Sequence, residues 1–195
     1  MRGRTAAALI TLLVVAGLFV GTPASAAPLE KGHFHDVYTD FFDCDSVSPS
    51  IPTRVDGDVH VNFTFNLRGG KNVFPYYRES VHGSNVFTNL DTGGTFTEVF
   101  TANSRDHKIV DNGDGTITIY GQGSGGSRYY DTNGRLVLRD PGNIRYAVDI
   151  DYNGTPGDAS DDIEVPDSFR IVRDSTGRND TAGRDFCEDL RQFAT

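Results

Sequence analysis

The sequence feature that most constrains the fold is the stretch VHVNFTFNL, residues 59–67. Its valines, phenylalanines and leucine alternate strictly with histidine, asparagine and threonine. A period of two places every apolar side chain on one face of a β-strand, whereas a helix would scatter them around its circumference. The alternation therefore predicts a strand with one buried face.

Segments rich in β-branched and aromatic residues recur along the chain, and turn signals separate them. Asn133-Gly134, for example, supplies residues that accept a positive φ, which is typical of a hairpin turn. Each such pair of segments predicts two antiparallel strands. The predicted strands and hairpins cover residues 32–42, 59–67, 73–81, 94–102, 107–121, 127–140, 143–152 and 161–172.

These segments predict an all-β domain, an antiparallel meander of about 8–10 strands that forms a small barrel. A closed or nearly closed barrel hides its strand edges and is favoured over the alternative, a sandwich. Residues 179–194 depart from period two, because Phe186 and Leu190 stand at helical spacing. They predict a short C-terminal helix, capped by Asp180 or Thr181.

The first 26 residues predict a secretory signal peptide. Arg2 and Arg4 give a basic start, an apolar run follows, and Ala24-Ser25-Ala26 provides an A-x-A cleavage site. The apolar run is shorter than the ~20 residues of a membrane-spanning helix. We therefore expect a secreted, extracellular protein with no membrane span, in which residues 27–195 form a single barrel-like domain.

The charge and the cysteines narrow the range of partners and compartments. The formal net charge is −9, and it becomes −11 without residues 1–26, which carry two arginines and no acidic residue. Such a charge repels phosphate backbones, so no nucleic-acid partner is expected. Two lone cysteines in an exported chain, Cys44 and Cys187, predict one disulfide that ties the start of the domain to its end.

Several motifs carry a resemblance. The stretches FFDCD, DHKIVDNGDGTITI, GRLVLRD and GTPGDASDD, followed by a cysteine-bearing helix, resemble those of uncharacterised exported β-rich proteins of Gram-positive bacteria. The resemblance covers most of residues 27–195; it implies an exported β-rich domain and transfers no activity. At the level of fold alone, the meander is also similar to barrels of the lipocalin and allene oxide cyclase kinds, an analogy that assigns no function.

The stretch DIDYNGTPGDASDD opens like a calcium-binding loop. Asp149, Asp151 and Asn153 fill the first, third and fifth ligand positions, a glycine follows for the sharp turn, and Asp158 is a further oxygen donor nearby. The twelfth position, however, is Ser160 instead of glutamate, and the flanks alternate like strands. A hairpin is therefore favoured, with a weak Ca²⁺ site at Asp149, Asp151, Asn153 and Asp158 as the alternative.

Histidines offer a second metal hypothesis. His33 and His35 stand two residues apart in a predicted strand, so their side chains share one face. A third ligand from another strand, among His60, His82 and His107, would complete a zinc or copper site. The alternative is that the two histidines are only solvated.

Two other polar stretches have simpler interpretations. The glycine-rich stretch GQGSGGS, residues 121–127, lacks the lysine of a phosphate-binding loop and precedes a strand, so it predicts a flexible loop. The polar row His60, Asn62, Thr64 and Asn66 is expected on an outer, solvated face, with a barrel interior as the alternative.

Neither G-x-S-x-G nor H-E-x-x-H occurs, so no catalytic residue is assigned. The leading hypothesis is an exported, non-enzymatic protein that holds a small apolar ligand or presents a surface to a partner. The alternatives are a barrel cyclase or isomerase, which needs few motif residues, and a structural secreted protein with a weak calcium site. No cofactor is expected beyond that Ca²⁺ alternative.

Overall fold

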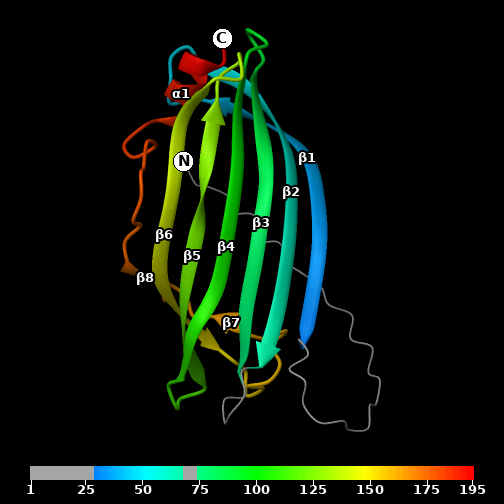
Figure 1. The fold of residues 1–195 in the computed structure, drawn as a ribbon, viewed down its shortest axis with the longest axis vertical. Helices are drawn as coiled ribbons and strands as arrows, with labels where there is room; N and C mark the ends of the chain where they lie inside the picture. Colours follow the sequence, from blue (N-terminus) through cyan, green and yellow to red (C-terminus); the bar gives the residue numbers. More distant parts are fainter. Residues whose placement is uncertain (1–28, 68–73) are drawn as a thin grey trace.

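The computed structural model describes residues 29–67 and 74–195, and most of them belong to one sheet (Figure 1). The segment predicted as a signal peptide, residues 1–26, lies outside the described residues. The elements are β1 (Glu30–Cys44), β2 (Ile51–Leu67), β3 (Pro75–Asn89), β4 (Thr95–Asp111), β5 (Thr116–Tyr130), β6 (Leu136–Asp151), β7 (Ile163–Glu164), β8 (Arg170–Arg173) and α1 (Phe186–Phe193).

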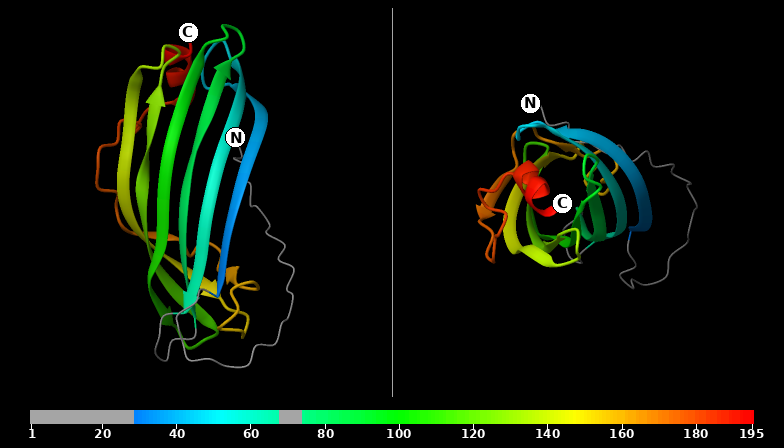
Figure 2. Two further views of the ribbon diagram at one scale, coloured as in Figure 1. Left: turned by 45° about the vertical axis from the view of Figure 1, so that its right-hand side comes forward. Right: turned by 90° about the horizontal axis from the view of Figure 1, so that it is seen from above.

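The strands form an antiparallel meander in the order β1 to β7, and β8 also pairs with β6. The predicted all-β fold with a short C-terminal helix is confirmed. The sheet curls about its long axis into a half-barrel (Figure 2). Within the described part of the chain β1 pairs only with β2, so the half-barrel stays open along the β1 side.

The principal strands are longer than predicted, and some of the predicted segments merge into one strand. The six principal strands are 15–17 residues long, which at about 3.3 Å per residue makes them roughly 50 Å long. Residues 94–102 and the start of 107–121 belong to a single strand, β4, which continues through a bulge between Asp106 and Lys108. Residues 127–140 and 143–152 likewise contribute to β6.

The prediction of a flexible loop at residues 121–127 is wrong. This stretch is the middle of β5 and pairs with β4 on one side and β6 on the other. Its glycines are needed for close packing: a Cβ on Gly121 would lie 2.2 Å from Cζ of Tyr146, and one on Gly125 would lie 2.1 Å from the backbone oxygen of Thr101. Glycine marks a close approach between strands at these positions.

Two clusters of buried apolar side chains lie at the two ends of the half-barrel. At one end α1 lies within the curve of the sheet (Figure 2), where Leu190 and Phe96 are 0% and 1% exposed. At the other end, Phe74, Ile109 and Ile117 form a second cluster. No helix of the described residues covers the concave face between the two clusters. No helix in residues 29–67 and 74–195 is long and apolar enough to cross a membrane.

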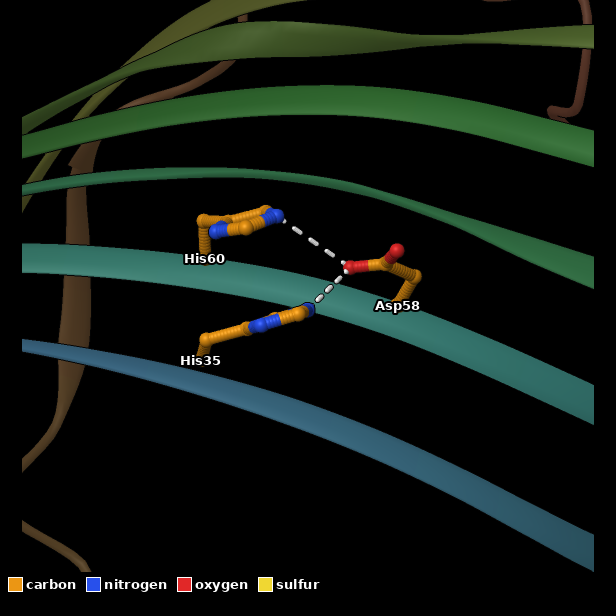
Figure 3. A group of neighbouring side chains, drawn as sticks. All are labelled: His35, Asp58 and His60. Atoms are coloured by element: carbon orange, nitrogen blue, oxygen red, sulfur yellow. Dashed lines mark hydrogen bonds and ion pairs between the residues drawn. The ribbon is translucent and has the colours of Figure 1, made fainter.

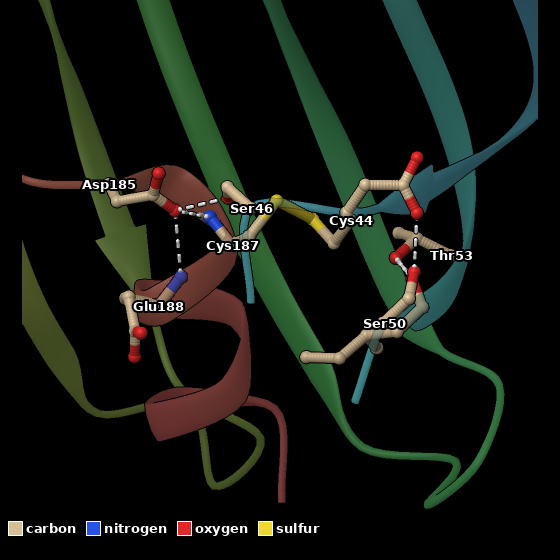
Figure 4. The surroundings of a disulfide bond; sticks show 9 residues. Cys44, Ser46, Ser50, Thr53, Asp185, Cys187 and Glu188 are labelled. Carbon is tan, nitrogen blue, oxygen red and sulfur yellow. Dashed lines mark hydrogen bonds between the residues drawn. A yellow bond between two sulfur atoms is a disulfide. The ribbon is translucent and has the colours of Figure 1, made fainter. Parts of the chain in front are cut away.

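The predicted disulfide is confirmed and fastens α1 to the end of β1 (Figure 4). The Cα atoms of Cys44 and Cys187 are 5.3 Å apart, and Cys44 is 1% exposed. Asp185 caps the helix, because its Oδ1 accepts hydrogen bonds from the backbone N–H groups of Cys187 (2.8 Å) and Glu188 (3.1 Å). Ser46 donates a further hydrogen bond to the same oxygen, 2.9 Å away.

The predicted caps, Asp180 and Thr181, are wrong because both residues serve the sheet instead. Asp180 accepts a hydrogen bond from the backbone N–H of Arg139 (3.0 Å), and the Thr181 hydroxyl donates to Asp140 (2.7 Å). The segment before α1 thus runs along the β6 edge, and the helix begins only after Asp185.

Candidate binding site on the concave face

The register of the sheet decides which side chains face the inside of the curve. Phe96 packs against the α1 end, so the side chains two, four, six and eight residues further along β4 share its concave face. Among them, Phe100 lies opposite Gly83 of β3 and Ser127 of β5. The same register extends to β6, where Asp140 lies opposite Ser127. The concave face therefore carries aromatic, small and acidic side chains together.

The stretch VHVNFTFNL, residues 59–67 in β2, follows its predicted alternation. Val61 faces the concave side and is 7% exposed, while His60 and Asn62 face the convex side. Phe63 and Phe65 also face the concave side, but they remain half-buried because the half-barrel is open above them. The polar row of β2 is thus an outer face, as expected, and the apolar row lines an accessible surface.

A trough of about 790 Å³ lies on the concave face over β4, β5 and β6. Its lining combines small residues of the sheet with larger apolar side chains. The floor includes Ala102, Gly123, Gly125 and Gly142. The apolar walls are Phe100, Ile144, Tyr146 and Phe169.

A hydrogen-bonded belt crosses the trough near its α1 end and centres on Glu98. Its carboxylate accepts hydrogen bonds from the Ser127 hydroxyl (2.6 Å), the Tyr129 hydroxyl (3.1 Å) and Nδ2 of Asn85 (3.1 Å). The Tyr38 hydroxyl donates to Oδ1 of Asn85 (2.8 Å), so the belt reaches from β1 to β5. Burial and the Glu98 carboxylate raise the pKa of Tyr129 to about 12, which keeps its phenol protonated as a donor.

A second polar belt crosses the sheet farther from α1. The Ser104 and Tyr146 hydroxyls are 2.8 Å apart, and the Tyr77 hydroxyl donates to Glu79, also at 2.8 Å. Burial raises the pKa of both tyrosines, so their hydroxyls also stay protonated. Ser104 follows Glu98 by six residues in β4, which separates the two belts by roughly 20 Å of mostly apolar floor.

The four residues predicted as calcium ligands lie around the end of β6 and the turn that follows it. The Asp149 carboxylate accepts a hydrogen bond from Thr118 (2.7 Å) and forms an ion pair with Arg170 (3.1 Å). Asp151 accepts from the backbone N–H of Asn153 at 2.8 Å. An arginine partner supplies part of the charge compensation that a cation would supply, and no pattern in the sequence pairs Arg170 with this strand.

Asp158 also serves its own turn, because it accepts hydrogen bonds from the Ser160 backbone N–H (3.0 Å) and hydroxyl (2.6 Å). Among the described residues, the one group of three histidine or carboxylate side chains close enough to share an ion lies elsewhere, on β1 and β2. The Ca²⁺ site at Asp149, Asp151, Asn153 and Asp158 therefore stays a prediction.

For the predicted zinc or copper site, the sheet brings four of the five histidines to neighbouring positions. His35 lies opposite His60, and His60 lies opposite His82, while His33 is next along β1. Sequence reasoning missed Asp58, whose carboxylate lies beside the stacked rings of His35 and His60 and approaches Nε2 of both (Figure 3). Its spacing of two residues before His60 was the signal, since that spacing puts both side chains on one face.

No family model, curated protein or solved structure matches this chain. The resemblance to exported β-rich proteins of Gram-positive bacteria therefore rests on its motifs. Function has to be argued from the geometry of the sites, because a fold by itself does not assign an activity.

Proposed function

We propose that this protein is an exported, non-enzymatic binding protein whose concave trough holds a small, largely apolar ligand. The observation that carries the proposal is the glycine-rich floor between aromatic walls. Gly123 leaves space at the floor that a larger side chain would fill, and the rings of Phe100 and Phe169 offer apolar contact area. The disulfide supports export, because such bonds persist in oxidising compartments.

The polar belts add a second feature to the expected ligand. A carboxylate has about four acceptor sites, and three donors already contact Glu98, so one site remains for a donor on the ligand. The Tyr146 hydroxyl lies beside the apolar floor as a second polar contact. We therefore expect a ligand with an apolar body and a hydrogen-bonding group at one or both ends. Glu98 orients such a ligand instead of reacting with it, in contrast to the cyclase or isomerase alternative.

The test uses 1-N-phenylnaphthylamine, an uncharged apolar fluorophore that the acidic protein does not repel. The wild-type protein should bind it saturably, with an increase in fluorescence. Gly123→Leu should weaken binding at least about tenfold, equivalent to 1.4 kcal/mol, because the leucine would occupy the floor. A Cβ at this position meets only Ile144, at 3.4 and 3.8 Å, so the backbone has no reason to move.

Gln122→Leu is the matched control, since residue 122 is the neighbour in β5 and faces the convex side. Its affinity should equal that of the wild-type protein, and both variants should keep the wild-type circular dichroism spectrum. Absence of saturable binding in the wild-type protein, or equal weakening in both variants, would overturn the proposed function.

A further inference from the structure

The convex face of β1, β2 and β3 carries a row of histidines that the trough does not use. The chain contains five histidines, and four of them, His33, His35, His60 and His82, lie on these three strands. The register aligns three of the rings across the strands. Neighbouring rings are nearly parallel, with centroid separations of 4.0 Å for His35 and His60 and 4.9 Å for His60 and His82.

Asp58 joins two of these rings into a compact group (Figure 3). Its Oδ1 lies 2.8 Å from Nε2 of His35 and 3.2 Å from Nε2 of His60. The two ring nitrogens and the carboxylate oxygen all lie within 4.8 Å of one another. In a tetrahedral zinc site with bonds of about 2.0–2.2 Å, neighbouring ligand atoms are roughly 3.3–3.5 Å apart. The rings of His35 and His60 are stacked 4.0 Å apart in the structure, so ion binding requires both rings to tilt out of this stack until their Nε2 atoms point at one ion beside Asp58.

The group is accessible from solvent. The side chains of His35, His60 and Asp58 are 44%, 33% and 55% exposed, so an ion can reach them without opening the sheet. The strands hold the ligands at fixed spacing, because His35 and His60 are opposite one another in the β1–β2 ladder. The excess of acidic residues over basic ones also favours the approach of a cation.

We propose that His35, Asp58 and His60 bind one divalent transition-metal ion, with zinc as the expected metal. Two imidazole nitrogens and one carboxylate form a borderline ligand set that suits Zn²⁺, and a water molecule completes the tetrahedron. His82, stacked on His60, and His33, whose Nδ1 is 3.0 Å from Oδ1 of Asn62, lie outside the first coordination shell. They support the orientation of the liganding rings.

The experiment is isothermal titration of the untagged secreted protein with ZnCl₂ in a buffer that does not chelate zinc. The wild-type protein should bind one ion per chain. His35→Asn, His60→Asn and Asp58→Asn should each weaken binding at least about tenfold, because each removes a ligand. Asp58→Asn keeps a hydrogen-bonding group of the same size, so its effect separates metal ligation from support of the two rings.

His107→Asn is the matched control, because His107 is exposed in β4 and is the one histidine outside the row. Its affinity for zinc should equal that of the wild-type protein. Zinc should also raise the melting temperature of the wild-type protein and of His107→Asn, and it should not do so in His60→Asn. Lack of saturable binding at millimolar zinc, or an equal loss of affinity in His107→Asn and His60→Asn, would overturn the site.

Discussion

The disulfide should contribute a large share of the stability of this fold. Cys44 and Cys187 are 143 residues apart in the sequence, so the bond closes a loop that spans nearly all of the described chain. The chain-entropy relation gives about 5 kcal/mol for a loop of this length, an upper figure for real proteins. Folding stabilities of single domains are about 5–15 kcal/mol, so the loss of this bond would remove a large fraction of the total.

The local structure around the disulfide also indicates that the bond stabilises the fold. α1 has eight residues and is too short to be stable by itself in water. It is held by the packing of Leu190 and Ala194, both 0% exposed, and by the disulfide that precedes them. Without the bond, undocking of α1 would expose the apolar cluster beneath it, including Phe96.

The perturbation is the double substitution Cys44→Ala with Cys187→Ala, followed by urea unfolding monitored by far-ultraviolet circular dichroism. We expect the free energy of unfolding to fall by about 3–5 kcal/mol. A reductant should lower the stability of the wild-type protein by a similar amount and leave the double variant unchanged. A loss below about 1 kcal/mol, or a double variant that still responds to the reductant, would refute the reasoning.

Two further predictions follow from burial and charge. Phe96→Ala should lower the free energy of unfolding, measured with urea, by about 3–5 kcal/mol because the Phe96 ring is 1% exposed. Phe63→Ala should lower it by only roughly 1–2 kcal/mol because Phe63 is half-buried. Equal losses in the two variants would contradict the open half-barrel. Burial and the neighbouring Asp161 raise the pKa of Asp162 to about 6, above its unfolded value, so its contribution to stability is full at low pH and is lost as the pH rises through 6. Asp162→Asn should therefore raise the melting temperature relative to the wild-type protein at pH 7.5 and by much less at pH 4, and a difference independent of pH would sink this assignment.

The all-β class, the disulfide and the C-terminal helix were predictable because each has a local or compositional signal. Alternation predicts the strand at residues 59–67, two lone cysteines in a chain expected to be exported predict one disulfide, and apolar spacing predicts the helix in the last segment. The helix start was missed because Asp180 and Thr181 bond to β6, a partner that no local pattern reveals.

The glycine-rich part of β5 was unpredictable for a related reason. Local propensity disfavours a strand at residues 121–127, but the segment gains partners on both sides and rings such as Tyr146 cover its glycines. These partners are distant in sequence, so only the assembled sheet reveals them. Sequence reasoning therefore missed the part of the trough floor that Gly123 and Gly125 form, because both glycines lie in the stretch that was assigned to a loop.

The single-layer sheet explains why one strand can contribute residues to both of the proposed sites. Successive side chains of β2 point to opposite faces, so Val61 contributes to the concave surface while Asp58 and His60 contribute to the convex histidine row. A second layer over either face would bury one of these sets and remove its access to solvent. The half-barrel instead leaves solvent access on both faces and has a cluster of buried apolar side chains at each end. Stability depends strongly on the end that carries α1 and the disulfide, and the proposed binding surfaces lie away from it, in the middle of the sheet.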